Sequence, residues 1–127
     1  MADAIRIALV GRHNIVREAL QRILARAFDI TYSGTLSDIK DFGVDEPVTI
    51  VLLIAEEWDD DTLLLIRAHF PGARNVLLSA DFDFQKLRSA FEHGVAGYVV
   101  KQISSERLVG SLRLVAMGEK VFPTELA

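Results

Sequence analysis

Residues that could do chemistry follow the apolar runs of this sequence. Gly-Arg-His at residues 11–13 follows "IALV", the acidic stretch 56–61 follows "VTIVLLIA", and Lys101 follows "GYVV". Ser79 lies near the end of a further run, "NVLLSA". If the runs are parallel strands of one sheet, their carboxyl ends form a shared edge, which is where open α/β sheets hold their ligands. Such an edge would gather Arg12, Ser79 and Lys101, two cations and a hydroxyl that suit an anion.

The composition limits what these residues can belong to. The chain has 127 residues, 50% of them hydrophobic, which supports one compact domain. Its 14 basic and 18 acidic residues give a net charge of −4, so the broad basic surface of a nucleic-acid-binding domain is not indicated. Cysteine is absent, which excludes a disulfide framework, a thiolate metal site and a cysteine nucleophile. No secretory signal pattern is present, and no apolar run approaches the roughly 20 residues that span a bilayer. We therefore expect a soluble, cytoplasmic protein that does not bind membranes.

Apolar runs alternate with segments of helical spacing. The runs cover residues 5–10, 28–34, 48–55, 75–80 and 97–100. Helical spacing covers residues 14–28 and 104–118 and, more loosely, 35–43 and 83–94. Nearly continuous apolar strands suit a sheet that is buried on both faces. The pattern predicts an α/β domain with a five-stranded, doubly wound parallel sheet.

The two longer helical segments are amphipathic. In the first, the residues expected to face the core are Val16, Leu20, Ile23 and Leu24, and those expected to point away are Arg17, Gln21 and Arg22. In the last, the expected apolar stripe is Leu108, Leu112 and Val115. Ser104 is a candidate N-cap of that helix, and Gly118 can close its end.

Three stretches carry a family resemblance. They are "NIVREALQRIL", "VLLSA" and "HGVAGYVVKQISSERLVGSLRLVAMGEKVF", the last with a Gly-x-x-Gly-Tyr-x-x-Lys spacing. In these stretches the chain resembles the receiver domain of bacterial response regulators, in the NarL/FixJ-type branch. The resemblance implies the flavodoxin-like, CheY-like receiver fold over residues 1–122.

The resemblance also implies a chemistry, which this sequence matches only in part. In the family a histidine kinase supplies a phosphoryl group to an aspartate after the third strand. An acidic pair after the first strand helps to hold Mg²⁺, which prefers hard oxygen ligands. Ser79 and Lys101 match the hydroxyl and lysine that hold the phosphoryl oxygens, and Tyr98 matches an aromatic that swings inward on activation.

The acidic half of that site is missing. Gly11 and Arg12 stand at the positions of the acidic pair, and a count of six from Pro47 places Leu53 at the phosphoacceptor position. Ile54 or Ala55 are alternative equivalents, and neither is a carboxylate. The sequence therefore predicts a degenerate phosphorylation site and an atypical receiver that acts without phosphorylation, without a cofactor or a metal, and without a histidine kinase.

Several charged residues have two interpretations. Arg12 is either a surface residue or a guanidinium in the place of the metal, paired with Glu56, Glu57 or Asp59. The acidic residues 56–61 are either a solvated loop and helix N-terminus or a displaced Mg²⁺ or phosphorylation site. The histidines, His13, His69 and His93, fall on different elements, so a metal site built from them is not expected.

Enzymatic activity is not expected. Ser79 beside Lys101 resembles a hydrolase dyad, but a histidine base and an oxyanion device are not indicated. The aromatic residues Phe82, Phe84 and Phe91 are either core residues or an exposed patch for a partner.

The sequence leaves two hypotheses for the function. The first hypothesis is a receiver domain of a transcriptional response regulator, which works as a homodimer or through a protein partner over residues 83–117, or over the first and last helices. Leu114 and Met117 are candidates for the contact, with core burial as the alternative. Residues 123–127 are expected to begin a linker to a helix-turn-helix DNA-binding domain absent from this chain, so DNA contact would come only from there. The rival is a sensor that binds an anion between Arg12, Ser79 and Lys101.

Overall fold

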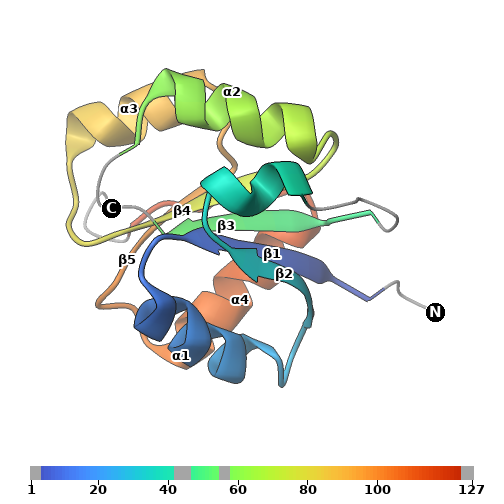
Figure 1. Cartoon of the computed structure of the whole chain (residues 1–127). Helices are drawn as coiled ribbons and strands as arrows, with labels where there is room; N and C mark the ends of the chain where they lie inside the picture. Colours follow the sequence, from blue (N-terminus) through green and yellow to red (C-terminus); the bar gives the residue numbers. More distant parts are fainter. Residues whose placement is uncertain (1–3, 42–46, 55–57, 124–127) are drawn as a thin grey trace.

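The computed structural model describes residues 4–41, 47–54 and 58–123. Strands and helices alternate along the chain (Figure 1). The strands are β1 (Arg6–Gly11), β2 (Asp29–Gly34), β3 (Ile50–Ile54), β4 (Arg74–Ser79) and β5 (Gly97–Val100). The helices are α1 (Asn14–Leu24), the 3-10 helix η1 (Ser37–Asp41), α2 (Asp60–His69), α3 (Phe84–Glu92) and α4 (Ser105–Ala116). All strand pairs are parallel, in the order β2-β1-β3-β4-β5, which confirms the predicted five-stranded sheet.

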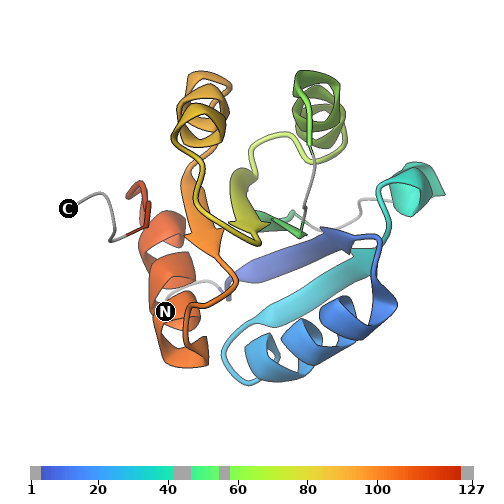
Figure 2. The same cartoon turned by 90° about the vertical axis from the view of Figure 1, so that its left-hand side faces the viewer.

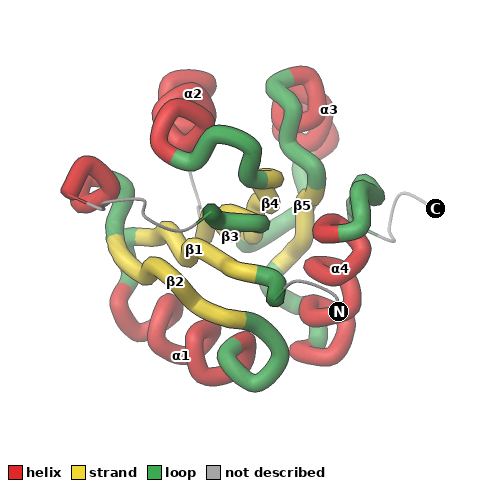
Figure 3. The backbone as a smooth tube through the Cα atoms, turned by 90° about the vertical axis from the view of Figure 1, so that its right-hand side faces the viewer, coloured by secondary structure: helices red, strands yellow, loops and turns green. Residues whose placement is uncertain are grey.

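Helices cover both faces of this sheet, as the apolar strands require. α1 and α4 lie on one face, and η1, α2 and α3 lie on the other (Figures 2 and 3). Successive side chains of a strand point to opposite faces, so the core divides into two clusters. In β3, Ile50 and Leu52 belong to the cluster under α1 and α4, whereas Val51 and Leu53 belong to the cluster under α2 and α3.

The last helix forms as the sequence predicts. The Ser104 hydroxyl caps α4 by accepting a hydrogen bond from the Arg107 N–H at 3.2 Å. The predicted stripe is fully buried and consists of Leu108, Leu112 and Val115. Gly118 has a φ of 103°, a conformation that glycine adopts without the strain of a Cβ and that commonly ends a helix.

The first helix departs from its prediction. Leu24 is buried and Val16 and Leu20 pack against the core, but Ile23 is 40% exposed at the edge of the apolar face. Arg17 is half-buried rather than extended into solvent, because its guanidinium turns back toward the end of β1. A long side chain one turn into a helix can reach the residues that precede the helix.

The chain does not leave the sheet at the end of α4. The Val121 N–H donates to the Ala96 carbonyl at 3.0 Å, and the Tyr98 N–H donates to the Val121 carbonyl at 2.9 Å. Val121 thereby forms a parallel bridge on the outer edge of β5. Of the predicted linker, residues 124–127 lie outside the described residues, and Pro123 is buried.

Within the described part of the chain, no helix has the length and apolar character needed to cross a membrane.

Candidate functional site

The ends of β1 and β3 lie side by side at the carboxyl edge of the sheet. Val10 is in register with Leu53, and Gly11 is in register with Ile54. A Cβ at Gly11 would lie 3.0 Å from the Cβ of Ile54 and 3.2 Å from its carbonyl oxygen, closer than side chains normally pack. Any side chain at residue 11, an aspartate included, therefore requires the β3 end to shift.

The predicted phosphoacceptor position is apolar and closed to solvent. Leu53 is 4% exposed and belongs to the cluster under α2 and α3, together with Val10 and Leu77. Ile54 is also buried and faces α1 and α4 instead. The third alternative for this position, Ala55, lies outside the described residues.

Arg12 is exposed and has no anionic neighbour in the described ranges. Of its three predicted partners, Glu56 and Glu57 lie outside the described residues. The third, Asp59, uses its Oδ1 to accept hydrogen bonds from the Thr62 N–H and hydroxyl, both at 2.8 Å. This part of the structure gives Arg12 the geometry of a surface residue.

Arg17, rather than Arg12, holds its guanidinium at the end of β1. Its Nη1 donates to the Gly11 carbonyl at 2.6 Å, and its Nη2 donates to Asn14 Oδ1. Its Nε is buried and has no hydrogen-bond partner among the described residues. Sequence analysis missed this residue, because a basic residue on a polar helix face carries no signal that its side chain folds back.

These side chains do not fit the Mg²⁺ that the family resemblance implies. Mg²⁺ requires an octahedron of hard oxygen ligands, usually with at least one carboxylate. Over the described residues, this end of the sheet offers a glycine, a buried leucine and an exposed arginine. The Gly11 carbonyl, a neutral oxygen that could serve as a ligand, already accepts from the Arg17 guanidinium.

The ends of β4 and β5 keep the other half of the predicted site. Ser79 is in register with Val100, and its carbonyl accepts a hydrogen bond from the Lys101 N–H at 2.8 Å. The structure therefore brings Ser79 and Lys101 together through the backbone. Ser79 is only 2% exposed, whereas the side chain of Lys101 is exposed next to α1 and α4.

Tyr98 points into the protein. Its side chain is fully buried in the cluster under α2 and α3, next to Leu87 and Ala90 of α3. Its hydroxyl donates to the Asp81 carbonyl at 3.0 Å, and Phe82 contacts the ring edge-on with centroids 6.4 Å apart. A buried phenol needs such a partner for its hydroxyl, so the inward position is satisfied.

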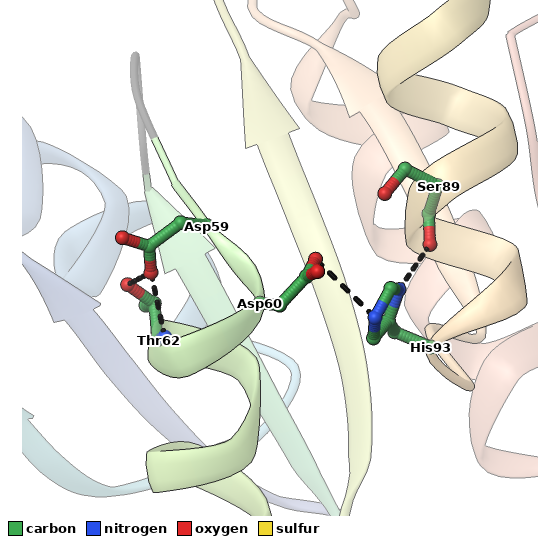
Figure 4. A network of polar contacts seen from close by, with 5 residues as sticks. All are labelled: Asp59, Asp60, Thr62, Ser89 and His93. Carbon is green, nitrogen blue, oxygen red and sulfur yellow. Dashed lines mark hydrogen bonds and ion pairs between the residues drawn. The ribbon is translucent and has the colours of Figure 1, made fainter.

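The acidic residues that follow β3 begin a helix. Asp59 is the N-cap of α2, and Asp60 and Asp61 occupy its first turn, where carboxylates are favoured by the helix dipole. Hydrogen bonds from the Thr62 backbone N–H and hydroxyl to Asp59 lower the pKa of that carboxyl (Figure 4). The helix N-terminus interpretation is confirmed for residues 59–61, and residues 56 and 57 lie outside the described ranges.

The histidines end or precede different helices, as predicted. His13 is the N-cap residue of α1, His69 ends α2, and His93 is the C-cap of α3. His93 Nδ1 contacts the Ser89 carbonyl at 2.8 Å, and its Nε2 lies 3.3 Å from Asp60 Oδ1 (Figure 4). Because a carbonyl can only accept, Nδ1 carries a proton, and a hydrogen bond to Asp60 needs the second proton of the imidazolium. This contact joins α3 to α2 and has a structural role.

Exposed apolar side chains collect on α4 and the segment after it. Leu114 is 46% exposed, Met117 is 77% exposed and Phe122 is 52% exposed, so the alternative of core burial for Leu114 and Met117 is wrong. On α3 and the loop before it, Phe82 and Phe91 pack partly against the core, whereas Phe84 is exposed. The aromatic residues of this segment therefore divide between the core and the surface.

Comparisons with known proteins find similarity to transcriptional regulators. No family model matches the chain. It is 27% identical over 125 residues to the transcriptional regulatory protein MctR of Rhizobium johnstonii, covering 93% of this chain and 58% of that protein. It is 25% identical over 144 residues to the uncharacterized transcriptional regulatory protein YxjL of Bacillus subtilis, covering 98% and 60%. The chain thus spans about 60% of the length of these curated relatives.

Solved structures share its fold. A LuxR family DNA-binding response regulator from Silicibacter pomeroyi superimposes with a TM-score of 0.78 and 25% identity, covering 95% of this chain and 98% of that one. A LuxR family two-component response regulator from Aurantimonas sp. gives 0.82 and 22%, covering 97% and 92%. A structure of RcsB dimers bound to two parallel DNAs gives 0.76 and 14%, covering 96% and 64%. The chain therefore has the CheY-like receiver fold and is a receiver-like domain similar to those of transcriptional response regulators.

Proposed function

We propose that this chain is an atypical receiver domain of a transcription regulator, which acts by dimerisation or protein contact and not through phosphorylation. One observation carries the proposal. Where the family resemblance calls for carboxylates, Gly11 packs tightly against Ile54 and Leu53 is buried among apolar side chains. Phosphoryl transfer to this fold needs a carboxylate nucleophile and a metal ion that neutralises the transferring group. The described residues at the ends of β1 and β3 offer no carboxylate for either purpose.

The position of Tyr98 supports the same proposal. In the family the equivalent aromatic swings inward on activation, and here the ring is buried and hydrogen-bonded to the Asp81 carbonyl. The hydrogen bond and the burial of the ring stabilise the inward orientation of Tyr98 through contacts within the domain itself. We infer that the surface through which the domain contacts other proteins, its output surface, is always formed. Its activity would then depend on whether a partner is available.

The output surface is the second part of the proposal. α3, β5 and α4 cover most of residues 83–117, and Leu114 and Met117 present apolar side chains from this region. Contact between two such patches would remove apolar surface from water, which is the usual driving force for dimerisation. RcsB forms dimers on DNA, and this chain would use a DNA-binding domain beyond residues 123–127 for that step. We assign it no enzymatic activity of its own.

The deciding experiment is an amide chemical-shift titration with Mg²⁺ and then with beryllofluoride, a phosphoryl mimic. The proposal expects no saturable shifts at residues 10–13, 53–57, 79 and 101. Saturable shifts that spread to Tyr98 would overturn it, because another carboxylate, such as Glu56 or Glu57, would then serve as the acceptor.

A sulfate titration of the same sample separates the anion-sensor alternative. Shifts limited to Arg12, Ser79 and Lys101 would favour a sensor over an interaction domain.

Light scattering of the native protein and of the Leu114→Glu variant tests the contact surface, since a dimer that uses this patch becomes monomeric when a charge replaces the leucine.

A further inference from the structure

A cavity lies at the amino edge of the sheet, at the opposite edge from the candidate functional site. It is formed where α2 and α3 end, on the face that both helices cover (Figures 2 and 3). Its lining comes from the end of α2, the turn that leads into β4, the start of β4 and the turn after α3. Its volume is about 400 Å³, within the roughly 300–1,000 Å³ of small-molecule sites in proteins.

A buried carboxamide, that of Asn75, lines this cavity. Asn75 is the second residue of β4, and its side chain lies on the same face as Leu77, the face under α2 and α3. The residue is 5% exposed, and its Oδ1 is buried without a hydrogen-bond partner in the part of the chain that the structure describes. An unpaired buried acceptor destabilises a fold, so it indicates a donor from outside the chain.

A cation, the guanidinium of Arg67, lines the same cavity. Arg67 is exposed, and no carboxylate within the described ranges forms an ion pair with it. Its Nη1 lies 3.9 Å from the position that a Cβ at Gly94 would take, so the side chain reaches from α2 to the turn after α3. A guanidinium binds a carboxylate through two parallel hydrogen bonds. This side of the cavity therefore suits a carboxylate.

The rim of the cavity carries little that could cover it. Gly72 and Gly94 have φ values of 85° and 84°, a conformation that favours glycine, so neither turn adds a side chain at these positions. A Cβ at Gly72 would meet nothing within 4 Å. Phe70, Pro71 and Ala73 supply an apolar part of the lining. A small ligand can therefore enter and place a short alkyl group against these residues.

The lining favours one class of ligand, a carboxylate with a hydroxyl on the adjacent carbon. The carboxylate suits Arg67, and a hydroxyl has one proton to donate, which matches the one unpaired acceptor of Asn75. An ammonium group has three protons and a positive charge, so a single acceptor does not satisfy it and Arg67 repels it. A second anionic group would bring an acceptor against an acceptor at Asn75.

We propose that this cavity binds a small 2-hydroxycarboxylate such as lactate. The carboxylate pairs with Arg67, the hydroxyl donates to Asn75 Oδ1, and the alkyl group contacts Pro71 and Ala73. The terminal torsion of a carboxamide is soft, so Oδ1 can turn toward the hydroxyl. The cavity shares no residue with the ends of β1 and β3, so this inference stands or falls separately from the proposed function.

The probe is L-lactate, titrated into this chain and followed by amide chemical shifts. We expect saturable shifts confined to residues 67–75 and 94–96. Propionate has the same carbon chain without the hydroxyl, and it should bind about tenfold more weakly or worse, because Asn75 Oδ1 then stays unpaired. Lactamide keeps the hydroxyl and loses the charge, and it should show no saturable binding.

Variants of the protein locate the site. Asn75→Leu keeps the approximate shape and removes both polar atoms, so it should bind lactate and propionate equally and unfold at a higher temperature than the native protein. Arg67→Gln should weaken the binding of both carboxylates about tenfold or more. Arg88→Gln makes the same change of charge outside the lining and should leave binding unaltered. A thermal unfolding curve for each variant confirms that it is folded.

Four results for the native chain would overturn the proposal. They are equal binding of lactate and propionate, shifts that map to the carboxyl edge around Arg12 and Lys101, no saturable binding of lactate, and tighter binding of L-alanine than of L-lactate. An Asn75→Leu variant that still prefers lactate over propionate would also overturn it, because the hydroxyl would then not reach Asn75.

Discussion

The two halves of the carboxyl edge of the sheet have diverged. At the ends of β1 and β3, a glycine packed closely against Ile54 and a buried leucine occupy the positions where the family resemblance calls for acids. At the ends of β4 and β5, Ser79, Tyr98 and Lys101 keep the residue types and places that the same resemblance implies. The comparison teaches that close apolar packing leaves little space for another side chain at the ends of β1 and β3, whereas polar residues lie at the ends of β4 and β5.

The largest expected effect comes from an attempt to restore the acceptor. Leu53→Asp places a carboxylate in an apolar cluster, and we expect it to cost about 5 kcal/mol or more, because the cavity and the buried charge add. Urea unfolding at neutral pH measures the loss. Burial would raise the pKa of the new carboxyl, so the variant should regain stability as the pH falls, whereas Leu53→Asn should not. A stable Leu53→Asp protein that binds beryllofluoride would remove the distinction between the two halves.

The next largest effect tests the inward position of Tyr98. Tyr98→Ala removes a fully buried ring and should cost about 3–5 kcal/mol. Tyr98→Phe removes only the hydrogen bond to the Asp81 carbonyl and should cost about 1 kcal/mol. Both costs are read from denaturant midpoints at a constant m-value. If Tyr98→Ala loses less than about 1 kcal/mol, the ring is not held inside in solution.

A smaller effect tests how closely β1 packs on β3. Gly11→Ala should destabilise the domain by about 1–3 kcal/mol, because its Cβ meets the Cβ and carbonyl of Ile54. The matched control is Gly110→Ala in α4, where a Cβ meets nothing within 4 Å. That substitution should stabilise the helix by about 1 kcal/mol at most, as alanine is the better helix former. Thermal unfolding of the two variants should therefore shift in opposite directions, and equal shifts would contradict the packing argument.

The smallest effect concerns the acids that follow β3. The folded-state pKa of Asp59 is lowered, so the charged cap stabilises the fold above the unfolded-state pKa, and this contribution is lost as the pH falls through the folded-state pKa. Asp59→Asn keeps a capping oxygen and removes the titration. Its stability should therefore change less than that of the native protein below about pH 4. If the free energy of unfolding of the native protein and of Asp59→Asn falls by the same amount at low pH, Asp59 does not cap α2 in solution.

Much of the fold could be predicted, because the signals are local. β-branched and aliphatic runs specify strands, and Ser104, Leu108 and Gly118 specify the start, the buried face and the end of α4. The loosely patterned segment 35–43 gave a weaker prediction, and its described part, residues 35–41, forms the short 3-10 helix Ser37–Asp41. Signals of this kind fail where a segment is too short to show a full period.

The candidate site was less predictable. The sequence indicated that Gly11, Arg12 and Leu53 lack carboxylates, but it left Arg12 as either a surface residue or the guanidinium at the β1 end, and Arg12 is exposed. The structure puts Arg17 there, bonded to the Gly11 carbonyl. The last strand predicted from the sequence ends at residue 100, yet Val121 also pairs with the sheet, at the edge of β5. Both contacts depend on where a side chain or strand lies in space, and neither leaves a periodic pattern.

The sequence by itself determined the alternation of strands and helices, the parallel sheet and the absence of acids at residues 11, 12 and 53, because these follow from residue type and spacing alone. Only the tertiary structure decided that a Cβ at Gly11 would press against Ile54 and that Tyr98 is closed inside. The physical reason is that these features are distances between residues far apart in the chain, set by how the helices pack on the two faces of the sheet.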